Sequence, residues 1–173
     1  MKKPSIITVI ALFLCGTAHS QCNWAKNEVD EFTGLKTRVL TMQDIDKKFT
    51  SRFWYSISML NVENGYMLSL RFTSGQRPDM INNGDKLLIM LNNNEIVELE
   101  ATETVITDAN VTQHGTTYII HPSYFVNRDM LEKISEAGIK KWRMHTSRAY
   151  LEYDFTRNGM NVVRQQIQCI LSE

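Results

Sequence analysis

The sequence predicts an α+β fold: a mainly antiparallel sheet, rolled or sandwich-like, with two helices in the C-terminal half. Between residues 53 and 101, short segments alternate apolar and polar side chains, with the period of two that strands have. Two later segments instead repeat apolar residues every three to four positions, as helices do. The resulting order, several strands followed by a helix, two strands and a helix, is typical of α+β proteins.

The clearest hairpin is expected at residues 53–60 and 66–72. The first strand places four apolar side chains on one face: Phe53, Tyr55, Ile57 and Met59. The return strand directs three inward: Leu68, Leu70 and Phe72. Asn64-Gly65 between them is a strong signal for a two-residue turn.

A second hairpin is expected after the turn at residues 82–85. Residues 86–91 are apolar on both faces, which indicates a covered strand. After Asn92–Asn94, residues 95–101 alternate and predict a strand with one wet face. The polar stretch 102–114 is interpreted as a long loop, and residues 117–121 as a further short strand.

Both helices have recognisable ends. The first is expected to begin at the N-cap Asn127 and to stop at Gly138, and the second to start after Thr156 and to run to about Leu171. The strands 139–145 and 149–155 lie between them. A turn centred on Thr146-Ser147 would pair three sets of residues: Lys141 with Glu152, Arg143 with Tyr150, and His145 with Arg148.

Residues 1–20 have the layout of a signal peptide. Lys2 and Lys3 precede an apolar run from Ile6 to Leu14, and Ala18-His19-Ser20 supplies a small-x-small exit. We expect cleavage after Ser20, which would leave residues 21–173 as a single exported domain, periplasmic or secreted. Cys22 follows Gln21 rather than a small residue, which makes it a poor acceptor for a lipid.

The cysteines point to one disulfide. Cys15 would leave with the signal peptide, so Cys22 and Cys169 remain as an even pair in an oxidising compartment. Cys169 lies roughly 150° from the centre of the apolar stripe of the second helix. This position favours a bond to an N-terminal segment that crosses the helix; two free thiols are the alternative.

Composition restricts the class of partner. The chain has 19 basic and 19 acidic residues, and removal of the two signal-peptide lysines gives a mature net charge of about −2. No basic stripe or second long apolar segment stands out, so we expect neither a nucleic-acid partner nor a transmembrane segment after signal removal. No motif indicates a cofactor.

Residues 143–148 form the most suggestive polar cluster. Lys141, Arg143 and His145 project to one side of a strand, and Arg148 joins them across the turn. Arg143, His145 and Arg148 are therefore candidate ligands for an anion or carboxylate, which guanidinium groups suit. The alternative is a solvated sheet face with cross-strand ion pairs, which are common at surfaces.

Other chemistry has weaker support. His145 and Ser147 share a strand face but lack the Gly-x-Ser-x-Gly context of a nucleophile. His114, His121 and His145 lie on separate elements, without the spacing of a metal site. The remaining patterns have ordinary structural interpretations: Asp44-Ile45-Asp46 as a solvated turn, Glu98 and Glu100 as a wet strand face, Asn110-Val111-Thr112 as a bare glycosylation sequon, and Trp24, Trp54 and Trp142 as groove or core residues.

Several short stretches together carry a resemblance. Cys22 precedes Asp30-Glu31-Phe32-Thr33-Gly34, and residues 83–87 and Cys169 follow later. This arrangement resembles small exported proteins of Gram-negative bacteria of the Bacteroidetes type. The resemblance implies a periplasmic or secreted α+β domain and carries over no catalytic residues.

Two functional hypotheses follow. The first is a non-enzymatic exported domain that binds a protein or a cell-envelope component, and it predicts an exposed apolar or aromatic patch. The second is a small extracytoplasmic hydrolase with a site near His145, and it predicts a pocket where that histidine meets other polar groups.

Overall fold

The computed structural model describes residues 22–46, 55–63, 65–75, 77–113 and 115–172. The expected signal peptide with its cleavage site lies outside these residues, as do Phe53, Trp54 and His114. None of the helices in the described part of the chain is both long and apolar enough to cross a membrane.

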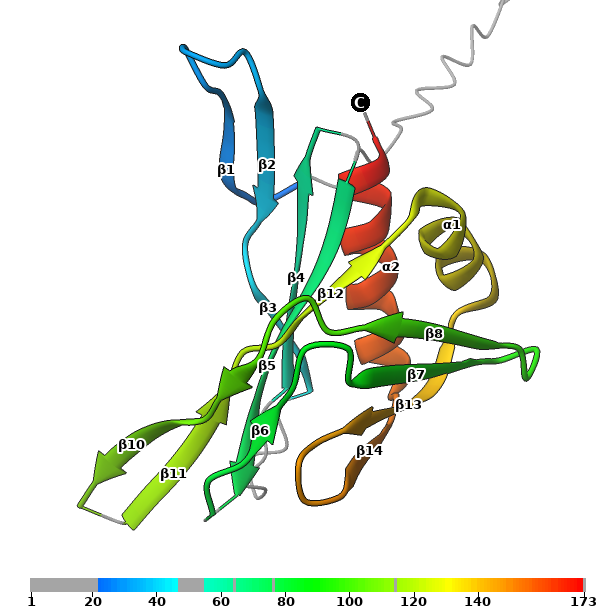
Figure 1. Ribbon diagram of the computed structural model, residues 1–173. Helices are drawn as coiled ribbons and strands as arrows, with labels where there is room; N and C mark the ends of the chain where they lie inside the picture. Colours follow the sequence, from blue (N-terminus) through cyan, green and yellow to red (C-terminus); the bar gives the residue numbers. More distant parts are fainter. Residues whose placement is uncertain (1–21, 47–54, 64, 76, 114, 173) are drawn as a thin grey trace, which may run out of the picture.

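The predicted α+β class is confirmed, since antiparallel sheets and two C-terminal helices build the fold (Figure 1). The helices are α1 (Arg128–Ala137) and α2 (Arg157–Leu171). Within the described residues, the largest sheet has eight strands: β1 (Trp24–Val29), β2 (Lys36–Leu40), β3 (Gln43–Asp46), β4 (Tyr55–Val62), β5 (Gly65–Gly75), β10 (Asp108–Thr112), β11 (Gly115–Ile120) and β12 (Ser123–Val126).

The other sheets are smaller. Four strands follow one another in the order β14-β13-β7-β8: β14 (Tyr150–Asp154), β13 (Ile139–His145), β7 (Lys86–Leu91) and β8 (Ile96–Glu100). β6 (Met80–Ile81) pairs with β9 (Val105–Ile106). A bridge between Ala101 and Tyr124 links the region of β8 to β12 of the large sheet.

The large sheet follows the path β1-β2-β4-β5-β11-β10 and projects a hairpin at each end (Figure 1). We call the β1–β2 hairpin the N-terminal arm and the β10–β11 hairpin the second arm. Every residue of β10 is exposed, as is every residue of β1 after Trp24. The arms are therefore surface features of the fold.

Both predicted hairpins are present. β4 pairs with β5, and Leu68, Leu70 and Phe72 are buried as expected. The turn lies one residue earlier than Asn-Gly predicts, because Val62 pairs with Gly65 and Glu63 takes the positive φ of 55°. β7 pairs with β8, and its residues are buried or half-buried on both faces, which confirms a covered strand.

The interpretation of residues 102–114 as a loop is wrong, because β9 and β10 form there. The side chains of these strands are largely exposed. Their sequences therefore lack the alternation of apolar and polar residues by which a strand is recognised. Strands β1–β3 and β12 also form where no strand was expected from the sequence.

Both helices begin and end as predicted. The Asn127 side chain accepts a hydrogen bond from the backbone N–H of Met130, and the Thr156 side chain accepts one from Gly159. Gly138 ends α1 with a φ of 73°, a conformation that favours glycine. α2 packs against β2, β3 and β4 and contacts α1.

The predicted disulfide between Cys22 and Cys169 is present, with the two Cα atoms 5.5 Å apart. It joins the segment before β1 to the last turns of α2. Cys169 and Gln166 are both buried, although they lie off the apolar stripe. Gln166 donates to the backbone carbonyl of Thr41 at 3.1 Å, so the chain between β2 and β3 covers this second side of the helix.

Candidate functional site

Arg143 and His145 lie on the outer face of the four-stranded sheet, as the sequence predicts for β13. The predicted cross-strand partners are wrong: Lys141 pairs with Asp154, Arg143 with Glu152, and His145 with Tyr150. The connection spans residues 146–149, which shifts the register by two relative to a turn centred on Thr146-Ser147.

Side-chain bonds within the connection explain this register. The hydroxyl oxygen of Thr146 accepts from the backbone N–H groups of Arg148 and Ala149, and its backbone N–H donates to the Ala149 carbonyl at 2.9 Å. Ser147 is held from outside the hairpin, because its N–H donates to the Met80 carbonyl at 2.7 Å. The wider loop thus bonds to itself and to β6.

Arg143 is already bound to an acidic partner. Its Nε and Nη2 donate to Oε1 of Glu152 at 2.7 and 2.5 Å, and its guanidinium lies 4.6 Å from the centre of the Tyr150 ring. Lys141 lies 3.9 Å from the same carboxylate. The hydrogen bond and charge of Arg143 hold the pKa of Glu152 below its usual value.

The structure does not assemble Arg143, His145 and Arg148 into one anion site. Arg143 is committed to Glu152, His145 is half-buried opposite Tyr150, and Arg148 is exposed in the connecting loop. The Ser147 hydroxyl donates to Oδ1 of Asp79 at 3.0 Å instead of to the predicted base, His145. The predicted alternative, a solvated sheet face with cross-strand ion pairs, describes these contacts.

A shallow groove lies on this same outer face, and we call it the sheet groove. Its volume is about 100 Å³. The apolar part of its lining is Leu88, Met90 and Ile96, with the buried Trp142 beneath; Lys141, Arg143 and Glu152 supply the polar part. Since small-molecule pockets have volumes of roughly 300–1,000 Å³, this groove suits one large side chain better than a metabolite.

Other candidate residues have structural roles. Within the described residues, no three His, Cys, Asp or Glu side chains lie close enough together to hold a metal ion. Asp44 and Ile45 belong to β3 rather than to a solvated turn; Ile45 is buried, and Asp44 accepts a hydrogen bond from the Ser56 hydroxyl at 2.7 Å. Glu98 forms an ion pair with Lys86 on the wet face of its hairpin.

The described tryptophans do not form an aromatic groove. Trp142 is buried in the core, where its ring contacts Tyr55, Tyr153 and Phe155. Trp24 is half-buried at the base of the N-terminal arm. Asn110 of the sequon lies on the exposed strand β10.

The end of the N-terminal arm is a further candidate site, which was not predicted from the sequence. Residues 30–35 connect β1 to β2, and we call them the arm tip. Phe32 at its end is 98 % exposed. Val29, directly before the tip, and Leu35, its last residue, are also exposed. The arm therefore presents a large aromatic side chain to solvent with two smaller apolar neighbours.

The arm tip has a defined conformation. Oδ1 of Asp30 accepts hydrogen bonds from the backbone N–H of Phe32 at 3.0 Å and of Thr33 at 2.7 Å, and from the Thr33 hydroxyl at 2.8 Å. The Gly34 N–H donates to the Asp30 carbonyl at 2.8 Å, and Gly34 takes a φ of 72°. The hydrogen bonds from Thr33 and Phe32 to the carboxylate lower the pKa of Asp30. Phe32 is thus held in a fixed turn.

The base of the arm is fixed to the body. Arg38 of β2 is buried, and its Nη1 donates to the Ser172 carbonyl at the end of α2 at 3.0 Å. Nη2 of the same guanidinium donates to Oδ1 of Asn61 on β4 at 3.1 Å, and the group lies 5.9 Å from the Trp24 ring centre. The Cys22–Cys169 bond lies beside this junction in the chain. The arm therefore projects from a rigid base.

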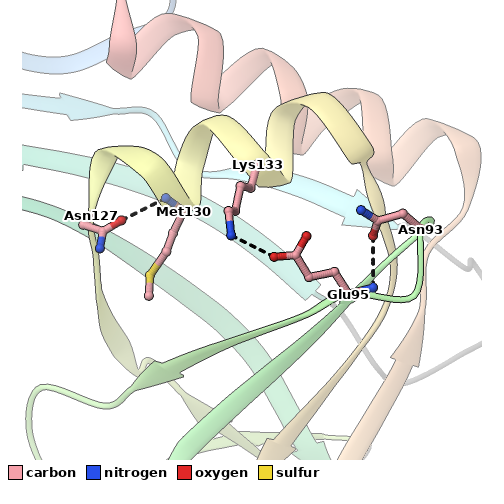
Figure 2. Close-up of polar contacts among 5 residues, drawn as sticks. All are labelled: Asn93, Glu95, Asn127, Met130 and Lys133. Atoms are coloured by element: carbon pink, nitrogen blue, oxygen red, sulfur yellow. Dashed lines mark hydrogen bonds and ion pairs between the residues drawn. The ribbon is translucent and has the colours of Figure 1, made fainter.

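A separate polar cluster joins α1 to the turn between β7 and β8 (Figure 2). Lys133 donates to Oε1 of Glu95 at 2.8 Å, and the Glu95 N–H donates to Oδ1 of Asn93 at 3.0 Å. The ammonium of Lys133 lowers the pKa of Glu95. Because these charges compensate each other, the cluster fixes the hairpin turn to the helix and offers no open binding site.

The signal for the arm tip is present in the sequence as turn chemistry. An Asp followed by Thr and Gly three and four positions later favours a side-chain-capped turn, and here Phe32 stands inside it. What the pattern could not reveal is that the turn lies at the end of a projecting arm.

No family model, no curated protein and no solved structure matches this chain.

Proposed function

We propose that the protein is an exported, non-enzymatic domain that binds a protein or cell-envelope partner through the tip of its N-terminal arm. The observation that carries this proposal is the 98 % exposure of Phe32 on a turn fixed by Asp30. Leaving a large aromatic side chain in water has no benefit for folding. Aromatic residues that bind partners often act as interface hot spots, and a fixed turn reduces the entropy lost on binding.

Two further observations support export. The N-terminal twenty residues have a signal-peptide layout, and the disulfide suits an oxidising compartment. The arm tip is also the Asp-x-Phe-Thr-Gly stretch on which the resemblance to exported Bacteroidetes proteins rests. A binding role would account both for the exposure of this stretch in the present protein and for its presence in the exported proteins.

The hydrolase alternative has no comparable support near His145. Ser147 is hydrogen-bonded to Asp79, Arg143 to Glu152, and the sheet groove is lined by residues other than His145. A site in which His145 activates a nucleophile would need a hydroxyl within hydrogen-bond reach of that histidine and donors for the developing oxyanion.

Site-specific photo-crosslinking tests the proposal. A photoreactive phenylalanine analogue replaces Phe32 in one variant and Val111 in a matched control, because Val111 is 75 % exposed on the second arm. After irradiation with cell-envelope fractions, we expect a discrete adduct from position 32 only. Excess unlabelled wild-type protein should suppress this adduct, and excess Phe32→Ser protein should not. Equal adducts from both positions, or equal competition by both proteins, would contradict the proposal.

A further inference from the structure

We propose that β10, the outer strand of the second arm, pairs antiparallel with β10 of a second copy, so that two large sheets join into one. This inference goes beyond the binding role of the arm tip, because it concerns the opposite end of the sheet. Three observations carry it: an open strand edge, a middle residue that can face its own copy, and side chains that become covered in that register.

The first observation is the open edge. β10 pairs with β11 through residues 108–112 without a register shift, and no described strand pairs with its other side. Such an edge presents backbone N–H and C=O groups, with which another extended backbone can pair. In Figure 1 the second arm projects from the body, and β10 lies on its outer side. A strand of another molecule can therefore reach this edge.

The second observation is the residue at the middle of the strand. The two larger sheets end in β1 and β10 and in β8 and β14. When a five-residue strand pairs antiparallel with its own copy over its full length, its middle residue faces itself. That residue is Glu98 in β8 and Glu152 in β14, and two carboxylates, which have acceptors only, cannot bond to each other. In β10 it is Asn110, whose amide has both a donor and an acceptor.

The fourth terminal strand, β1, is protected in another way. Its register with β2 shifts between Trp24 and Lys26, and Lys26 is exposed. Bulges and lysines are features that keep exposed strand edges from pairing. β10 has an unbroken register and contains neither lysine nor proline. Of the four terminal strands, β10 is therefore the one suited to pairing with a copy of itself.

The third observation is the set of side chains that meet in the register centred on Asn110. Ala109 of one copy faces Val111 of the other, and Asp108 faces Thr112, so no two charges lie opposite each other. Val111 is 75 % exposed in the single chain. Because the contact occurs twice by symmetry, two valines lose exposure to water.

The expected assembly is a closed dimer. The same strand of both copies forms the contact, and the two-fold axis passes between the two Asn110 residues. Antiparallel pairing sends the two bodies in opposite directions, and a third copy finds no free β10. A five-residue edge is a small interface, so we expect a dissociation constant between about 10 μM and about 1 mM.

Sedimentation velocity of the purified, disulfide-bonded protein tests the dimer. We expect the weight-average mass of the wild type to rise with concentration toward twice the monomer mass and not beyond it. Asn110→Asp and Asn110→Lys each place like charges opposite each other, so each should weaken association about threefold to tenfold. Asn27→Asp makes the same change at an exposed position of β1. It is the matched control and should associate as the wild type does.

Mixing two variants tests the register. An equimolar mixture of Asn110→Asp and Asn110→Lys proteins brings opposite charges together only if position 110 faces itself. We expect heterodimers that are about tenfold tighter than either homodimer. Near-ultraviolet circular dichroism spectra that match the wild type establish that both variants are folded, as expected for an exposed position.

Four results would overturn the inference: a wild-type protein that stays monomeric across the range, undiminished association of both Asn110 variants, a mixture that associates no more tightly than its components, or loss of association in Asn27→Asp, which would move the contact to β1. The photo-crosslinking test of the arm tip is independent of these results. At about 0.1 μM protein the dimer is dissociated, so the control at position 111 has no second copy to react with.

Discussion

Gly159 in the first turn of α2 lies directly against Ile45 of β3. A Cβ atom built on the glycine would be 2.6 Å from Cγ2 of Ile45 and 3.1 Å from its carbonyl oxygen. The helix can approach the sheet this closely because position 159 has no side chain. Ile45 itself is completely buried, so it has little room to move away.

We therefore expect Gly159→Ala to destabilise the protein, although alanine is the better helix former. The gain in helix propensity is about 1 kcal/mol, and overpacking against a buried backbone costs about 1–3 kcal/mol. Urea unfolding should show a net loss of up to about 2 kcal/mol. Asn161→Ala, at an exposed position of the same helix, is the control and should change stability by less than about 0.5 kcal/mol.

The disulfide should contribute strongly to stability. It connects residues 147 positions apart, and the chain-entropy model assigns such a loop on the order of 5 kcal/mol, although measured values are often lower. Replacing both Cys22 and Cys169 by serine should lower the free energy of unfolding by about 2–5 kcal/mol. Urea titration measures this effect.

Mass spectrometry checks the same bond directly. After denaturation without reductant, alkylation should modify neither Cys22 nor Cys169, and reduction should make both available. Two alkylated thiols in the unreduced sample would refute the bond. A purified chain that retains Cys15 would add one thiol to both samples, so the comparison concerns peptides containing positions 22 and 169.

Buried Arg38 should stabilise the junction between the arm and α2. Arg38→Ala removes its bonds to the Ser172 carbonyl and to Asn61 and leaves the Asn61 oxygen without this donor. We expect a loss of about 3 kcal/mol, since bonds to charged groups contribute about 1.5–3 kcal/mol each and are not additive. Lys36→Ala, an exposed position on the same strand, should stay within about 0.5 kcal/mol. Urea unfolding of the three proteins provides the comparison.

The conformation of the arm tip should depend on pH through Asp30. Hydrogen bonds from Thr33 and Phe32 place the pKa of this carboxyl below that of an ordinary aspartate. Because the folded value lies below the unfolded one, the contribution to stability is complete above the unfolded pKa. It is lost as the pH falls through the folded pKa. At neutral pH we expect the tip to be fully formed.

Nuclear magnetic resonance can follow this transition. The amide shifts of Phe32 and Thr33 should titrate with a midpoint below that of Asp30 in a short peptide of residues 28–36. Asp30→Asn should abolish the titration and increase the mobility of Phe32. Equal midpoints in the protein and the peptide would show that the tip does not stabilise the carboxylate.

Elements with a buried face were predictable from the sequence, and exposed elements were not. β5, β7 and β8 place buried apolar side chains at every second position, and β4 does so at Ile57 and Met59, although Ser56 and Ser58 are buried as well. The helices α1 and α2 have polar caps that mark their starts. β10 has no buried face, so it has neither feature. A strand of this kind is defined by its pairing with β11, and cross-strand hydrogen bonds leave no periodic trace in one segment.

The predicted polar cluster shows a related limit. The sequence correctly places Arg143 on the outer side of a strand, but its partner depends on register. A connection of residues 146–149, set by bonds from Thr146 and by contacts with β6, changes that partner from Tyr150 to Glu152. A shift of two positions keeps each side chain on its predicted face and replaces an open guanidinium with a compensated one.

The covalent link between Cys22 and Cys169 makes the chain between them a closed ring. A single proteolytic cut within that ring would release no fragment until the protein is reduced. The same 5.5 Å separation of Cα atoms makes the fold suitable for circular permutation, in which a short peptide replaces the bond and new termini open in an exposed connection. Opening the ring between Thr112 and Gly115, in the second arm, would leave the arm tip and the sheet groove intact.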